Sequence, residues 1–128
     1  MGLTKALLWI SVAAFTLTGL GYLLAPVTML SVVGVASEPT TEFLIRTEGV
    51  ALLFGAACVW TVLDGSARAT RIVLTALAFY YIVGSVIDLQ AFSTGVVGQA
   101  AVPSAIIRIV TGGLCLVSAV RMGASEGT

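Results

Sequence analysis

Five ionisable side chains interrupt the apolar parts of the chain, and these are the residues best suited to chemistry. They comprise three acids and two arginines: Glu42, Arg46, Glu48, Asp88 and Arg108. A charge that faces lipid is costly, so we expect these residues to meet one another inside a helical bundle. Arginine and carboxylate form pairs, and the carboxylate left in excess is able to take up or release a proton.

We predict that four of these residues form a catalytic site: Asp88, Glu48, Arg46 and Arg108. Asp88 is expected to form a buried salt bridge with Arg108 or with Arg46. Glu48 is the first choice for the acid or base, because it has no partner on its own helix face. The arginines would hold a carboxylate or stabilise an oxygen on which negative charge develops. The alternative is structural, since charge pairs between helices also set the helix register without chemistry.

Four further side chains are predicted to contact a substrate. Tyr81 and Ser85 share a helix face with Asp88, at spacings i, i+4 and i+7. Glu42 and Thr111 lie on the helix faces that carry the two arginines. For Tyr81 the alternative is an ordinary aromatic residue of the bundle.

The composition places these residues in a membrane. The 128 residues allow one domain, 1–128, and they are 59% hydrophobic and only 9% charged, with a mean hydropathy of +1.11. A soluble domain carries about 25% charged residues. The net charge is zero, so we expect no nucleic-acid partner. The chain has no His, and we expect neither a metal nor another cofactor.

Four apolar runs can position the charged residues, and each is close to the ~20 residues that cross a bilayer as a helix. The short connections between them predict an all-α, four-helix transmembrane bundle with up-down-up-down topology. The expected helices are 3–25, 43–63, 72–89 and 102–120.

The connections carry further signals. Residues 27–34 are too few to span, and they form either a short interfacial helix or an apolar loop. Glu38 to Thr41 is read as a turn with a helix N-cap. Pro103 suits the first turn of a helix, where its missing N–H costs nothing.

The basic residues predict the orientation. With the N-terminus inside, Lys5, Arg68, Arg71 and Arg121 all lie on the cytoplasmic side. The positive-inside rule therefore favours a multi-pass protein of the cell membrane with both termini in the cytoplasm.

Residues 42–49, continuing to Gly55, resemble the start of the second helix in a group of small bacterial four-helix membrane proteins of unknown function. An Arg, a Gly about three residues later and a further Gly recur there. That group has an Arg on helix three and a Glu on helix four, whereas Asp88 and Arg108 carry the reversed signs here. The resemblance implies a fold and no activity.

Two kinds of function follow. The first is a small membrane enzyme, an isomerase, cyclase or hydrolase without a metal, that acts on an apolar metabolite by acid–base chemistry. Isomerisation, hydration, cyclisation or epoxide opening would fit. The alternative is a non-catalytic membrane subunit or scaffold. A carrier is less favoured, because no internal repeat is visible. The expected partners are membrane lipid and an apolar small molecule, and a homo-oligomer is left open.

Overall fold

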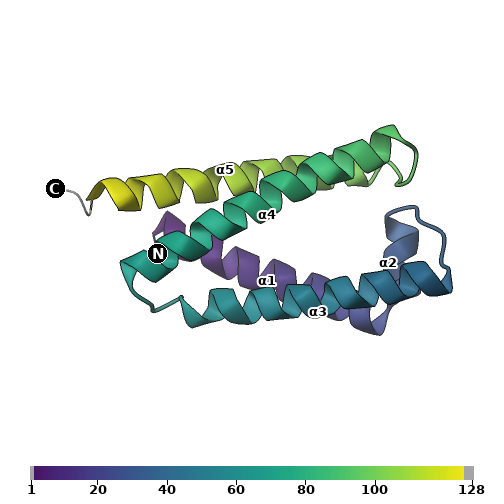
Figure 1. Ribbon diagram of the computed structural model, residues 1–128, viewed down its shortest axis with the longest axis horizontal. Helices are drawn as coiled ribbons and strands as arrows, with labels where there is room; N and C mark the ends of the chain where they lie inside the picture. Colours follow the sequence, from purple (N-terminus) through teal and green to yellow (C-terminus); the bar gives the residue numbers. More distant parts are fainter. Residues whose placement is uncertain (1, 126–128) are drawn as a thin grey trace.

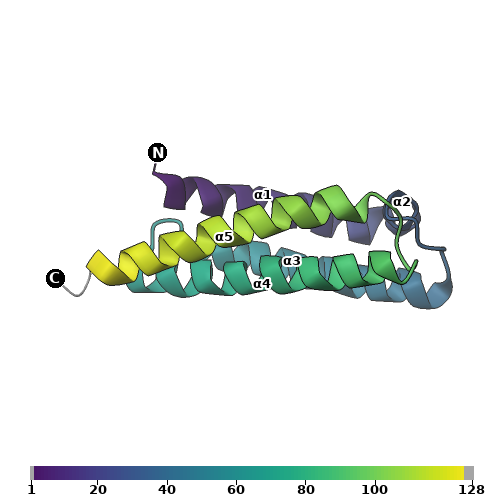
Figure 2. The same cartoon turned by 90° about the horizontal axis from the view of Figure 1, so that it is seen from above.

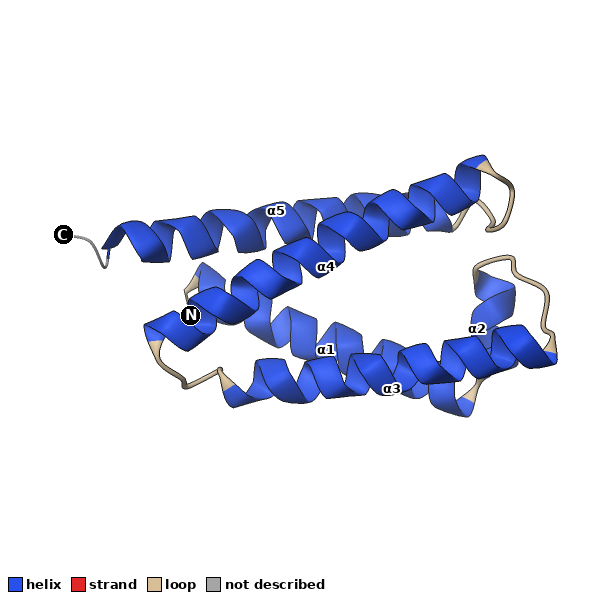
Figure 3. Ribbon diagram, viewed as in Figure 1, coloured by secondary structure: helices blue, strands red, loops and turns tan. Residues whose placement is uncertain are grey.

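The protein is all-helical, and it contains four long helices and one short one. The computed structural model describes residues 2–125, and no strand occurs in that range. Figures 1 and 3 show the helices joined by short loops. Their bounds are Leu3–Leu24 (α1), Pro26–Val32 (α2), Pro39–Thr61 (α3), Ala67–Ser93 (α4) and Ala101–Ser125 (α5).

Helices α1, α3, α4 and α5 are each long and apolar enough to cross a membrane. This confirms the predicted four-helix bundle and is the arrangement expected of a multi-pass membrane protein. The helices extend beyond most of the apolar runs that predicted them. In α4, Ser66 is the N-cap and its hydroxyl accepts the N–H of Ala69 at 3.3 Å, so residues 67–71 are helical.

The segments beside Pro26 and Pro39 are more helical than the sequence indicated. Pro26 occupies the first position of α2, where its fixed φ suits a helix start, and the alternative of an apolar loop is therefore wrong. Pro39 begins α3, so the predicted turn at Glu38 to Thr41 is also wrong. There the Thr41 hydroxyl accepts the N–H of Glu38 at 2.9 Å. Pro103 lies in the first turn of α5, as predicted.

The long helices form two antiparallel pairs. Helix α1 packs along α3 and helix α4 packs along α5, while α1 and α5 touch over a shorter stretch. Both chain ends lie at one end of the molecule, here named the terminal end (Figures 1 and 2). The opposite end carries α2 and is named the α2 end. Figure 1 shows the two pairs moving apart toward the α2 end.

Glycines bring the helices of each pair close together. A Cβ added to Gly19 in α1 would lie 2.9 Å from the carbonyl oxygen of Gly49 in α3. A Cβ added to Gly112 in α5 would lie 2.9 Å from a carbon of Ile82 in α4. Small residues at such contacts are typical of membrane helices, where close backbone packing replaces the hydrophobic effect.

The two pairs are joined again by their loops at the α2 end. The N–H of Gly98, between α4 and α5, donates to the carbonyl of Val33 at 2.8 Å. Gly34 has a φ of +74°, a conformation that favours glycine. The space between the pairs is therefore limited by the packed core at the terminal end and by this loop contact at the α2 end.

Candidate functional site

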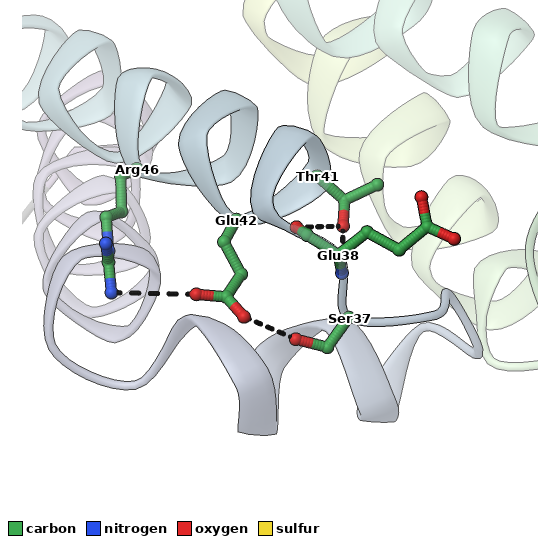
Figure 4. A network of polar contacts seen from close by, with 5 residues as sticks. All are labelled: Ser37, Glu38, Thr41, Glu42 and Arg46. Atoms are coloured by element: carbon green, nitrogen blue, oxygen red, sulfur yellow. Dashed lines mark hydrogen bonds and ion pairs between the residues drawn. The ribbon is translucent and has the colours of Figure 1, made fainter.

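Glu42 and Arg46 form a pair on α3, apart from the other charged residues. Their nearest charged atoms are 3.9 Å apart, and the Ser37 hydroxyl donates to Glu42 at 2.6 Å. Figure 4 shows these side chains together at the start of α3, on the side away from α4 and α5. Arg46 therefore pairs along its own helix and not with Asp88. Glu42, one turn away on the same helix, neutralises the charge of Arg46, so Arg46 needs no partner on another helix.

Asp88 and Arg108 pair between α4 and α5. Arg108 Nη1 donates to Asp88 Oδ2 at 2.7 Å, so Arg108 is the partner among the two predicted arginines. Gly84 makes room for the guanidinium, since an added Cβ there would lie 3.3 Å from Arg108 Nη1.

This ion pair is not buried, which corrects the prediction of a buried salt bridge. The side chains of Arg108 and Asp88 remain 27% and 33% exposed. Asp88 continues the α4 face that is fully covered at Ser85. One turn further along α4, at Asp88, the same face is only partly covered.

Glu48 is an exposed carboxylate within a membrane-length helix. It lies ~13 Å along α3 from Pro39 at 1.5 Å per residue. Within residues 2–125 it takes part in no ion pair or hydrogen bond. An ionisable group at such a depth is by default a functional-site hypothesis.

Glu48, Asp88 and Arg108 line one cavity, here named the central cavity. It has a volume of about 490 Å³ and is lined by residues of α1, α3, α4 and α5. Tyr22 and Tyr80 supply further polar atoms, and the guanidinium carbon of Arg108 lies 5.7 Å from the centre of the Tyr80 ring. The remaining lining is Phe79, Val83, Gly84 and Ile87.

A second cavity, here named the apolar cavity, adjoins the first. Glu48 and Tyr80 line both of them. The apolar cavity has a volume of about 330 Å³ and follows α3 and α4 toward the terminal end. Its other lining residues are Phe15, Ala51, Leu52, Gly55, Cys58, Val59, Val73, Ala76 and Leu77.

A smaller cavity of about 170 Å³ lies on the α1–α5 side of the same region. Arg108 and Tyr80 line it as well, together with Thr111. The Thr111 hydroxyl donates to the carbonyl of Ile107 at 2.8 Å. Thr111, one of the four predicted substrate contacts, therefore lines the same cavity as Arg108.

Tyr81 and Ser85 lie in the packed interior. The Tyr81 hydroxyl donates to Ser11 of α1 at 3.0 Å, and Tyr81 also lines the smaller cavity. The Ser85 hydroxyl is fully buried and is 2.6 Å from the carbonyl of Tyr81 and 3.2 Å from that of Ala105. Both hydroxyls are thus used in helix packing, which agrees with the alternative interpretation of Tyr81.

Sequence reasoning missed Tyr22, and of the adjacent Tyr80 and Tyr81 it chose Tyr81 as the substrate contact, whereas Tyr80 lines the central cavity. Tyr80 stands at spacings of four and eight residues from Gly84 and Asp88, a signal that could have placed it on the same stripe of α4. Tyr22 lies within an apolar run on another helix, and no spacing relates it to the charged residues.

Comparisons of the chain with protein-family models, with curated proteins and with solved structures find no match.

Proposed function

We propose that this is a small membrane enzyme that performs acid–base chemistry on an apolar metabolite in the central cavity. The observation that carries the proposal is Glu48, a carboxylate without a partner among the described residues, in a cavity lined by all four long helices. The cavity volume of about 490 Å³ lies in the usual range of small-molecule sites. An apolar substrate would enter it laterally from lipid.

The three charged groups divide the chemistry between them. Glu48 removes a proton from the substrate and returns it at another atom, or activates a water molecule. Arg108 stabilises an oxygen that gains negative charge, with the guanidinium atoms that Asp88 does not occupy. Asp88 orients Arg108 through the 2.7 Å contact. Isomerisation, hydration, cyclisation and epoxide opening all fit this set.

Arg46 and Glu42 have no step in this proposal. They lie outside the lining of the central cavity and neutralise each other along α3. The charged residues that do line the cavity are Glu48, Asp88 and Arg108. Since Asp88 pairs with Arg108, Glu48 is the carboxylate in excess.

Solvent deuterium tests the proposal without a known substrate. The protein is reconstituted into vesicles with a total lipid extract, incubated in D₂O and the lipids are analysed by mass spectrometry. Isomerisation, cyclisation and alkene hydration add a proton to carbon, and this proton is a solvent deuteron once Glu48 has exchanged with D₂O, so a substrate of these classes gains carbon-bound deuterium with the native protein. Epoxide opening instead raises the substrate mass by one water molecule. We expect Glu48→Gln to abolish either change. Asp64→Asn removes a carboxylate at the terminal end and serves as the control.

The same spectra separate the enzyme from the alternative of a non-catalytic membrane subunit. Identical spectra with and without the native protein would contradict the proposal. A folded Glu48→Gln protein with full deuterium transfer would remove Glu48 from the chemistry.

A further inference from the structure

The charged groups of the central cavity do not balance. Glu48 and Asp88 carry two negative charges when ionised and Arg108 carries one positive charge, which leaves one negative charge in excess. Asp88 and Arg108 already neutralise each other at 2.7 Å, so the excess is located on Glu48. A ligand that brings a positive charge would neutralise it, whereas an anion would add to the excess.

The aromatic lining favours the same kind of ligand. Tyr22, Phe79 and Tyr80 line the central cavity, and because the Arg108 guanidinium already lies 5.7 Å from the centre of the Tyr80 ring, Tyr22 and Phe79 are the rings left for a ligand. The face of an aromatic ring attracts a cation, most strongly when the site is partly dry. Rings together with a carboxylate form a suitable site for an organic ammonium group.

The position of the apolar cavity indicates how a ligand would be oriented in the site. It starts at Glu48 and Tyr80 and reaches Cys58 and Val59 on α3, ~16 Å further toward the terminal end. Its lining is apolar except for Glu48 at one end and the tyrosine beside it. A chain of methylene groups fits there while a polar head group stays in the central cavity.

Resting on the function proposed above, we infer that the ligand is a single-chain amphiphile with a cationic head group. The ammonium group lies beside Glu48 in the central cavity, and the hydrocarbon chain lies between α3 and α4 in the apolar cavity. Such a molecule reaches the site from the bilayer, where its own polarity already aligns it along the helices.

Three probes with equal chains and different head groups test the inference: decyltrimethylammonium, decanol and decanoate. Binding is measured by calorimetry at submicellar concentrations, to the protein in uncharged phosphatidylcholine nanodiscs, with empty nanodiscs subtracted. We expect decyltrimethylammonium to bind at least about tenfold more tightly than decanol, and decanoate to bind most weakly. Equal or tighter binding of decanol or decanoate would overturn the inference.

Two variants locate the head group. Glu48→Gln should abolish the preference for the cation, and Glu48→Asp should retain it. Asp64→Asn changes the net charge equally but lies at the terminal end, so it should leave the preference intact. A cation preference that survives in folded Glu48→Gln would overturn the assignment. The ranking of probes on the native protein remains a test if that variant does not fold.

A third variant locates the chain. Ala51 lines the apolar cavity three residues beyond Glu48, and Ala51→Leu would fill part of it. This variant should weaken decyltrimethylammonium and decanol by the same factor and leave their ratio unchanged. Unchanged binding of both probes would overturn the placement of the chain. The calorimetry concerns binding alone, so a wrong head-group preference leaves the deuterium result standing, and absent deuterium transfer leaves the cation site standing.

Discussion

Asp88 and Asp64 each contact a basic side chain, at 2.7 and 3.0 Å, in different surroundings. Asp64 is 89% exposed and pairs with Lys5, whereas Asp88 is 33% exposed and lies between two membrane helices. Removing one member of a shielded pair leaves the other charge without compensation. Exposed pairs contribute little. The two aspartates therefore form a matched comparison.

We expect Asp88→Asn to lower the free energy of unfolding by about 1–2 kcal/mol, because Arg108 loses a charged partner in a partly dry site. Asp64→Asn should leave the free energy of unfolding almost unchanged. Unfolding in mixed micelles, followed by circular dichroism, measures both. Equal losses for the two variants would show that Asp88 and Arg108 are as well hydrated as the exposed pair.

Exchanging the two charges tests the pair itself. Asp88→Arg and Arg108→Asp alone each place two like charges together, and the double variant restores opposite charges. We expect the double variant to be more stable than either single variant, with a coupling energy of about 1–2 kcal/mol. Additive losses in the same unfolding measurement would mean that the contact does not contribute to stability.

At the scale of helices, two neighbouring glycines of α5 differ in their surroundings. A Cβ at Gly112 would approach Ile82 to 2.9 Å, whereas a Cβ at Gly113 would meet nothing within 4 Å. We expect Gly112→Ala to destabilise the α4–α5 contact by about 1–3 kcal/mol through overpacking. Gly113→Ala is the control and should be neutral or slightly stabilising, since alanine favours helix. A loss of stability in Gly113→Ala equal to that in Gly112→Ala would contradict the packing shown.

The helices could be predicted from the sequence because lipid imposes one strong rule. A segment of ~20 apolar residues must satisfy its backbone internally, so it becomes a helix. The ends were less accurate, since Ser66 and Pro39 start helices in polar sequence that hydropathy does not detect. Helix α2 remained undecided for the same reason, because seven residues carry little periodic signal.

The site was predicted in part. Two partners for Asp88 were open, and the pairing with Arg108 depended on which helices pack together. Periodicity placed Tyr81 on the same face of α4 as Asp88, and this placement is correct. It does not say how far along that face the neighbouring helices stay in contact. Tyr81 lies where α1 contacts α4 through Ser11, whereas Asp88, about two turns further along, contacts only Arg108 of α5 among the described charged residues and is partly exposed.

At the scale of the whole molecule, the orientation in the membrane remains a prediction. The start of α1, the start of α4 and the end of α5 lie at the terminal end (Figures 1 and 2), and Lys5 and Arg68 are in the first turns of α1 and α4. We expect this end to face the cytoplasm. A fluorescent-protein fusion after residue 128 should fluoresce, and an alkaline phosphatase fusion at Val97 should be active. The reverse pattern would show that the α2 end faces the cytoplasm.

The contact between Asp88 and Arg108 joins α4 and α5, which are synthesised after α1 and α3. Arg108 therefore has its counterion, Asp88, on the neighbouring helix of the same pair when that pair enters the bilayer. In the first pair, Arg46 is neutralised by Glu42 in the same way, and Glu48 alone enters without a counterion. Glu48 is therefore translated before α4 and α5, which supply Tyr80 and Arg108 to the cavity around it.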